Sequence, residues 1–277
     1  MTAIQQFAFQ SIVHSLVAVV VLETLVQAWR LRQPALRHRF HVLALALPAV
    51  TVPLYQWLYP ARASQAFRQQ QALLDLEGWR SLEVGGWQPV AIGLGLVMGA
   101  TTFLFLAQEV LPALRLYWWH RGWRPRSPTG EEATRIEAAL GHLPASHTLP
   151  AIIIADQELP LAYARGLALP CLVLSPPLLR ILDDRELAAV LAHELAHLRR
   201  RDNWSGWALL ALRSVQFFNP VALLVFRHIL YDTERVCDDE AAAATGDALA
   251  LASGLLKVWR PASPAASRPA RRVWLGA

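Results

Sequence analysis

The sequence predicts a mainly α-helical membrane protein with three N-terminal transmembrane helices, followed by an α+β domain that contains a small sheet. Three observations support this fold class: an apolar composition, three long apolar segments before residue 112, and mixed helix and strand patterns after residue 127. Hydrophobic residues make up 55% of the 277 residues and charged residues 17%, whereas soluble domains contain roughly 45–50% and 25%. Part of the chain is therefore expected to lie in lipid.

The three apolar segments each approach the roughly 20 residues that a helix needs to cross a hydrocarbon core of about 30 Å. The second segment contains Pro48 and Pro53, which a spanning helix tolerates with a kink. The first contains His14 and Glu23, which need partners on neighbouring helices because lipid does not solvate them. The predicted transmembrane helices comprise about residues 9–29, 41–59 and 90–111.

The basic residues predict how these helices are oriented. Four arginines and no acidic residue lie between the first two segments, and further unopposed arginines follow the third. Because cytoplasmic loops carry the excess of Lys and Arg, we expect a multi-pass protein of the cell (inner) membrane. Its N-terminus would lie outside, and the chain after Trp118 would lie in the cytoplasm. This topology explains the net charge of +5, so no direct nucleic-acid binding is expected.

The sequence Ser-Pro-Thr-Gly at residues 127–130 is typical of a linker between two domains. We therefore expect a membrane domain over residues 1–126 and a second domain over residues 127–260. Residues 261–277 are rich in Pro, Ala, Ser and Arg, a composition that predicts a disordered tail. The second domain should begin with a helix at 131–140 and strands at 151–155 and 169–175.

The sequence His-Glu-Leu-Ala-His is the strongest motif in the chain. Asp183 and Glu186 form a capping box before it, so the motif lies in a predicted helix. Residues four apart share one helix face, which allows His193 and His197 to bind one metal ion. Glu194 can then lie over the open position of the metal and accept a proton from water. This arrangement predicts one Zn²⁺ per chain, with Glu194 as the catalytic residue.

A catalytic zinc ion usually has a third protein ligand, and the acidic residues downstream are candidates. Glu234 and Asp238 are four residues apart and share one helical face. Glu234 can bind the metal directly, and Asp238 can accept the N–H of a ligating histidine and thereby determine its tautomer. Asp239 and Glu240 are rival carboxylates, and a solvated acidic face is the alternative interpretation, so spacing alone leaves the third ligand open.

In combination, three segments resemble metallopeptidase family 56, the BlaR/MecR-type membrane antirepressor zinc peptidases. The segments are HELAHLRRRD, FFNP and YDTERVCDDEAA, and the similarity extends from about Leu161 to about Ala244. The resemblance implies a zincin-like (gluzincin) metallopeptidase domain on the cytosolic side and a zinc metalloendopeptidase activity. It further implies a general base at Glu194, metal ligands at His193, His197 and Glu234, and an Asp238 carboxylate that accepts the free N–H of a ligating histidine.

The apolar stretch between the histidines and Glu234 determines whether these residues can meet. If residues 207–230 crossed the membrane once, Glu234 would lie on the opposite side from His193. Asn219 can cap a new helix with Pro220 in its first turn, and each half is then too short to span. We therefore predict a helical hairpin over residues 205–230 that returns to the cytosolic side.

Three residue groups have weaker assignments. His228 and Tyr231 are possible oxyanion donors for amide hydrolysis, with interfacial packing as the alternative. The strand at 169–175 is a candidate edge strand that could hold an extended substrate. Cys237 is interpreted as a buried helix residue rather than a nucleophile.

These observations suggest a membrane-embedded zinc endopeptidase that cuts a cytosolic or membrane-proximal protein. The resembling family cleaves a transcriptional repressor when an external domain senses a ligand, which makes a repressor protein in a signalling pathway a candidate partner. No sensor domain follows Glu240, so direct antibiotic sensing is not expected. One alternative is an HtpX-like membrane quality-control protease, although that group usually places two full spans between the motif and the glutamate. The other is a catalytically silent membrane signalling or scaffold protein.

Overall fold

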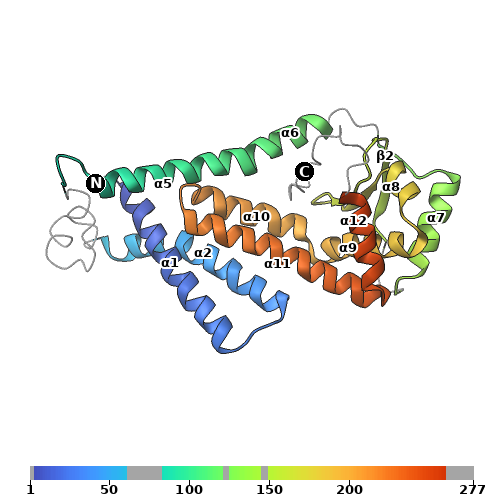
Figure 1. Cartoon of the computed structure of the whole chain (residues 1–277), viewed down its shortest axis with the longest axis horizontal. Helices are drawn as coiled ribbons and strands as arrows, with labels where there is room; N and C mark the ends of the chain where they lie inside the picture. The colour runs from blue at the N-terminus through green and yellow to red at the C-terminus, as the bar shows by residue number, and fades with distance from the viewer. Residues whose placement is uncertain (1–2, 61–82, 121–124, 145–148, 260–277) are drawn as a thin grey trace. The chain divides into compact units, whose positions relative to one another are not determined.

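The computed structural model describes residues 3–60, 83–120, 125–144 and 149–259. These residues are mainly helical and include one small mixed sheet (Figure 1). They form two compact units, residues 1–110 with 209–233, and residues 111–208 with 234–277. The predicted disordered tail at 261–277 lies outside the described residues.

The first unit contains the apolar helices. Its N-terminal elements are α1 (Ala3–Ala28), α2 (Pro34–Leu58), α5 (Pro89–Phe105) and the short π-helix η2 (Leu106–Val110), after which α6 (Leu111–His120) begins the second unit. Among the described residues, three helical stretches are long and apolar enough to cross a membrane, in agreement with the three predicted segments: Phe7–Ala28, Pro34–Leu58 and Pro89–Arg115.

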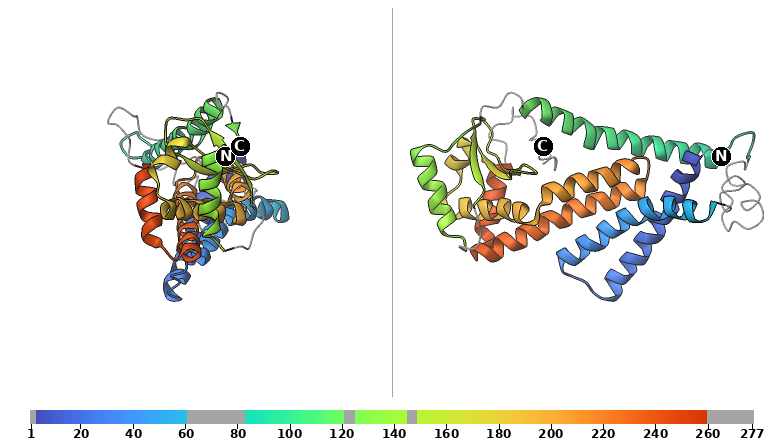
Figure 2. Two further views of the ribbon diagram at one scale, coloured as in Figure 1. Left: turned by 90° about the vertical axis from the view of Figure 1, so that its right-hand side faces the viewer. Right: turned by 180° about the vertical axis from the view of Figure 1, so that it is seen from behind.

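The core of the first unit includes the apolar parts of two later helices, α10 (Asp202–Val215) and α11 (Pro220–Thr245). These helices lie side by side in Figures 1 and 2. Their buried side chains pack against α1 and α2 in one apolar cluster, which contains Leu22, Ala44, Leu45, Leu209, Ala222, Val225, Phe226 and Ile229. Residues 209–233 therefore cluster with the apolar helices, and the domain boundary at residue 127 stays a prediction.

A buried polar turn separates α10 from α11. The Arg213 guanidinium donates to the carbonyl of Gln216 at 2.7 Å, at the end of α10. Asn219 Oδ1 accepts from the backbone N–H groups of Val221 and Ala222, which caps the start of α11 as its residue type favours. The Asn219 amide also donates to Ser15 Oγ at 2.8 Å. The helices extend beyond residues 205–230, and the return to the cytosolic side stays a prediction.

A histidine in the first unit lies between two carboxylates. His41 Nδ1 is 2.7 Å from Asp232 Oδ2, and His41 Nε2 is 2.9 Å from Glu23 Oε1. An ionised carboxylate only accepts hydrogen bonds, so both ring nitrogens must carry a proton if both acids are ionised. The His228 ring stacks on the same imidazole with 5.3 Å between centroids. The contact gives Glu23 the partner that an acidic residue on an apolar helix requires.

We expect His41→Ala to destabilise the first unit by about 3–5 kcal/mol, because the mutation leaves the buried Asp232 carboxyl group without the imidazole that lies 2.7 Å from it. The measurement is thermal unfolding of the purified chain in detergent. His14→Ala is the matched control, since His14 hydrogen-bonds to a neutral hydroxyl, Thr51 Oγ1 at 3.3 Å, instead of a carboxylate. Equal destabilisation by both mutations would contradict the importance of the ion pair.

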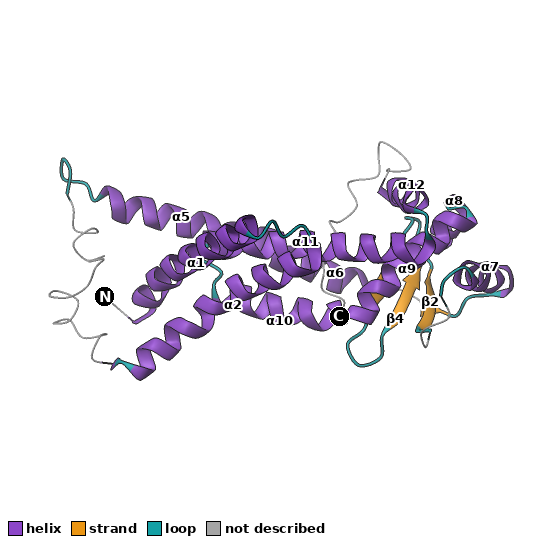
Figure 3. Ribbon diagram, turned by 90° about the horizontal axis from the view of Figure 1, so that it is seen from below, coloured by secondary structure: helices purple, strands orange, loops and turns teal. Residues whose placement is uncertain are grey.

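The second unit contains the sheet and four helices packed around it. The strands are β1 (Pro125–Arg126), β2 (Ala151–Ala155), β3 (Ala162–Arg165) and β4 (Cys171–Leu174). They lie in the order β1-β2-β4-β3, with β2 and β4 parallel and the other two pairs antiparallel. The strands are orange in Figure 3. The helices are α7 (Gly130–Gly141), α8 (Pro176–Ile181), α9 (Asp184–Arg200) and α12 (Ala248–Trp259).

The strand expected at 169–175 is not an edge strand. Its counterpart β4 pairs with β2 on one side and with β3 on the other, and all four of its residues are buried. A continuous apolar strand of this kind is typical of a sheet centre. The edges of the described sheet are β1 and β3. Sequence analysis did not predict β3, because its four residues show no period-two alternation.

Helix α9, which carries the His-Glu-Leu-Ala-His motif, is held at its start by the expected capping box. The Glu186 N–H donates to Asp183 Oδ1, and the Asp183 N–H donates to Glu186 Oε2, both at 2.9 Å. The Glu186 carboxylate also accepts from Ser253 and Lys257 of α12 at 2.6 Å. Gly254 allows the two helices to approach closely, because a Cβ there would lie 3.1 Å from Val190.

Candidate metal centre

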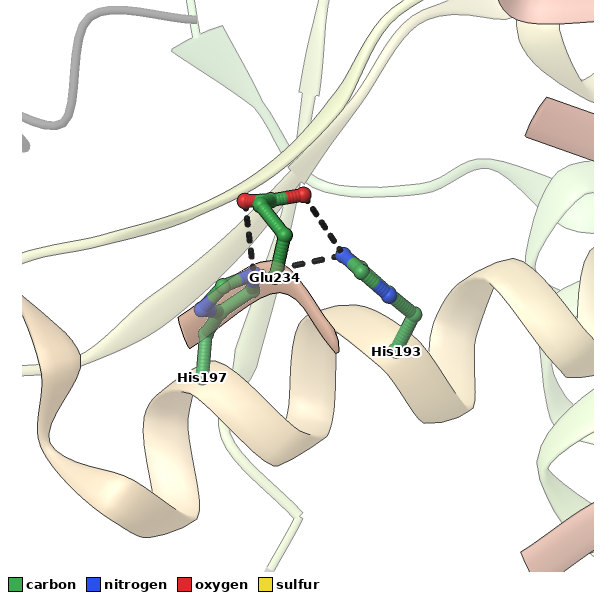
Figure 4. Close-up of side chains that lie close together, drawn as sticks. All are labelled: His193, His197 and Glu234. Carbon is green, nitrogen blue, oxygen red and sulfur yellow. Dashed lines mark hydrogen bonds and ion pairs between the residues drawn. The ribbon is translucent and has the colours of Figure 1, made fainter. Parts of the chain in front are cut away.

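Two imidazoles and a carboxylate meet in the second unit, as the spacing on α9 predicts for the histidines. His193 and His197 are buried, and their Nε2 atoms lie 3.2 Å apart. Glu234 of α11 lies across from both rings, with Oε2 3.7 Å from His193 Nε2 and Oε1 3.7 Å from His197 Nε2. Figure 4 shows the three side chains pointing toward one another. Their donor atoms all lie within 4.8 Å of one another, so this group can hold a metal ion.

The carboxylates behind the imidazoles indicate which nitrogen atoms can face the centre as acceptors. His193 Nδ1 lies 2.9 Å from Asp238 Oδ1, and His197 Nδ1 lies 2.9 Å from Asp202 Oδ2. A carboxylate accepts from an imidazole whose Nδ1 carries the proton, and such a neutral ring presents its Nε2 lone pair to the centre. In this tautomer the two lone pairs and the Glu234 carboxylate would repel one another at these distances, and a cation between them would remove the repulsion.

The distances fit a tetrahedral zinc ion. Zinc binds histidine nitrogen at about 2.0–2.1 Å, which places two such ligands about 3.4 Å apart at the tetrahedral angle. The observed separation of 3.2 Å between the two Nε2 atoms agrees with this value. The set of two imidazoles and one carboxylate also leaves one tetrahedral position open, as catalytic zinc sites require.

Asp202 is a residue of this site that sequence analysis did not single out. It is buried at the start of α10 and hydrogen-bonds to His197. Arg201, the last residue before it, has a φ of 56°, and this left-handed turn ends α9 directly before Asp202. The signal was present in the sequence, because Asp202 ends the basic stretch of the HELAHLRRRD segment.

The surroundings of His197 change the pKa of its imidazole. Burial lowers this pKa, but the hydrogen bond to Asp202 and the charges of Glu194 and Glu234 raise it by more, so the net pKa lies above the ordinary value. The Cys237 Sγ atom lies 3.3 Å from His197 Nδ1, and burial raises the pKa of this thiol. A thiol of raised pKa is a poor nucleophile at neutral pH, which agrees with its interpretation as a buried helix residue.

We expect Asp202→Asn to weaken zinc binding by about 10–100-fold, because the asparagine cannot hold His197 in the required tautomer as a carboxylate does. The measurement is competition for zinc against a chromophoric chelator. Asp239→Asn is the matched control, since Asp239 is an exposed carboxylate close in sequence to the site. If both variants bind zinc as the unchanged chain does, Asp202 has no such role.

Glu194 lies beside the histidines and against the edge of the sheet. Its side chain is buried, and its Oε2 atom accepts from the backbone N–H of Ala164 on β3 at 3.1 Å. Ala164 is paired with Leu172 of β4 in the register of the sheet, while its N–H is directed to Glu194. The carboxylate therefore lies between the paired histidines and the edge strand.

The rival carboxylates are placed differently from Glu234. Asp239 is exposed, and the Glu240 carboxylate accepts from Arg199. Within the described parts of the chain, the groups of side chains that can hold a metal include Glu234 and neither of these two residues. Tyr231 is 61% exposed on α11, and His228 stacks on His41 in the first unit. The assignment of either residue as an oxyanion donor stays a prediction.

The matching family model and the relatives by sequence are both named as proteases. The family model described as BlaR1 peptidase M56 matches residues 60–258. A protein named Protease HtpX homolog from Methylibium petroleiphilum is 27% identical over 209 residues, which cover 64% of this chain and 72% of that protein. A protein of the same name from Burkholderia mallei is 27% identical over 213 residues, which cover 65% of this chain and 73% of that protein. The crystal structure of S. mikatae Ste24p aligns over 93% of this chain and 69% of that chain, with 15% identity and a TM-score of 0.35.

Proposed function

The chain belongs to the M56 family of BlaR1-type peptidases, and from this premise we propose that it is a membrane-embedded zinc-dependent endopeptidase. The observation that carries the proposal is the convergence of His193, His197 and Glu234 at distances that suit one zinc ion. The peptidase domain would have a zincin-like fold of the gluzincin type. It would face the cytoplasm from the inner membrane, with the N-terminus outside, as the arginine distribution favours.

In this proposal each residue of the site has a distinct role. His193, His197 and Glu234 hold the zinc ion, and Asp238 and Asp202 orient the two imidazoles. A bound zinc ion supplies Lewis-acid chemistry, which polarises the scissile carbonyl and lowers the pKa of a water molecule toward about 7. Glu194 takes a proton from the attacking water and delivers it to the leaving amine.

The exposed edge of the sheet supports a peptide as substrate. Strand β3 is an edge strand, and an edge strand binds an extended peptide by adding it to the sheet through backbone hydrogen bonds. The contact between Ala164 and Glu194 places this edge next to the general base. A peptide bound along β3 would therefore bring a backbone carbonyl close to the zinc ligands.

Two classes of substrate are supported by different observations. The resemblance to the BlaR/MecR-type peptidases favours a repressor protein in a signalling pathway, whereas the relatives at 27% identity are named protease HtpX homologs and favour membrane quality control. N-terminal proteomics distinguishes these classes when cells with the unchanged chain are compared with cells that carry Glu194→Gln. One dominant cleaved regulator supports signalling, and many fragments of membrane proteins support quality control.

Zinc content and proteolysis together test the proposal. The purified chain in detergent should contain about one zinc ion, lose hydrolysis of an unfolded protein substrate when a chelator is added, and recover it when zinc is returned. Elemental analysis and fragment release on gels measure these two quantities. A chain that neither binds zinc nor cleaves would support the silent scaffold and would overturn the proposal.

A further inference from the structure

The loop that joins β3 to β4 is apolar and exposed. It reads Gly-Leu-Ala-Leu-Pro at residues 166–170, and Leu169 is 85% exposed. Turns on a water-facing surface are usually rich in polar residues. An exposed apolar loop of this kind indicates a surface that contacts either a lipid bilayer or another protein.

The backbone of the loop has a specific conformation that side chains of α10 hold by hydrogen bonds. Gly166 has a φ of +94°, and a side chain at this position would collide with the carbonyl of Leu169. The Gly166 carbonyl accepts from the Asn203 amide at 3.0 Å, and the Leu167 carbonyl accepts from the Trp204 indole at 3.1 Å. Side chains of α10 therefore satisfy two backbone carbonyls of the loop. Groups that enter lipid must be satisfied in this way, because lipid has no water to bind them.

The residues beside the loop have the composition of a membrane interface. Trp204 and Trp207 are three residues apart on α10, and both side chains are exposed. Arg201, one turn earlier, is exposed as well. Tryptophan is enriched at the headgroup level of membranes, and basic residues near the surface are attracted to anionic lipid.

We propose that the loop at 166–170, together with Trp204 and Trp207, is a lipid-contacting surface that inserts Leu169 into the bilayer. The two indoles lie at the headgroup level, and Arg201 faces anionic headgroups. The composition favours lipid over a protein partner, because an exposed leucine is flanked by two exposed tryptophans and a basic residue in a chain with three candidate spans among its described residues. One consequence rests on the proposed function: β3 directly precedes the loop, so the substrate edge would lie at the membrane surface and receive membrane-proximal segments.

Fluorescence quenching in nanodiscs tests this contact without any measurement of activity. Leu169→Cys is labelled with an environment-sensitive nitrobenzoxadiazole group and placed in discs of phosphatidylethanolamine and phosphatidylglycerol. We expect the emission of the label to shift to the blue and to be quenched by lipids that carry a nitroxide on the acyl chain. A water-soluble collisional quencher should quench this label less than a label on a water-exposed residue. Cys171 and Cys237 are buried, and the unchanged chain reports any label that they take up.

Leu249→Cys is the matched control, since this leucine is 83% exposed on α12. A label at residue 249 should be quenched by the water-soluble quencher and not by the nitroxide lipids. The proposal is overturned if the label at 169 is as accessible to the water-soluble quencher as the label at 249. It is equally overturned if the label at 169 is shielded from water but not quenched by lipid, because a protein would then cover the loop. Both outcomes are independent of whether the chain hydrolyses peptides.

Discussion

Glu194→Gln is expected to lower the rate of peptide-bond hydrolysis by about 10²–10⁴-fold, the usual contribution of a general base. The amide has nearly the same shape as the carboxylate and can still accept from the Ala164 N–H, as Glu194 Oε2 does at 3.1 Å. It cannot take a proton from water. Because Glu194 is not one of the three converging donors, the zinc content should stay at about one per chain.

Hydrolysis rates and zinc analysis on the same preparation separate these two effects. Glu137→Gln is the matched control, since Glu137 is an exposed glutamate on α7, and its rate should be unchanged. A Glu194→Gln variant that cleaves at the original rate would show that another group activates the water. A variant that loses zinc as well as activity would place Glu194 among the ligands.

Glu234→Ala should remove zinc and abolish hydrolysis, because two imidazoles alone provide fewer protein ligands than catalytic zinc sites use. We expect the zinc content to fall from about one per chain to a small fraction after dialysis against a weak chelator. The Glu234 side chain is partly exposed, so its truncation should cost little stability, and thermal unfolding in the presence of the chelator checks this expectation.

The neighbouring carboxylates supply the controls for this prediction. Asp239→Ala and Glu240→Ala change charges on the same helix, but neither side chain belongs to a group that can hold a metal among the described residues. Both variants should keep zinc. If either of them loses zinc while Glu234→Ala retains it, the third ligand has been assigned to the wrong carboxylate.

Local periodicity explains what sequence analysis could predict. Three apolar segments of sufficient length predict three helices of the kind found in the structure. A helix repeat of 3.6 residues places His193 and His197 on one face wherever α9 packs, and the capping box at Asp183 depends only on residues three apart. The break before Pro220 is equally local, because Asn219 caps the helix with its own side chain.

Contacts between distant parts of the chain explain what could not be predicted. Asp202 was not selected because its burial and its bond to His197 depend on the turn at Arg201 and on the packing of α10. The edge strand was misidentified because the order of strands in a sheet depends on pairing partners, which no single strand encodes. His41 likewise has its carboxylate partners on two other helices.

The sequence by itself determined the two histidines, the glutamate between them, the helix that carries them, and the apolar segments. Only the tertiary structure brought Glu234 together with both histidines, placed Asp202 beside His197, and made β3 the edge next to Glu194. The physical reason is the range of the interactions. Helix periodicity and capping act within a few residues, whereas a metal centre forms where separate helices pack, and packing is a property of the whole fold.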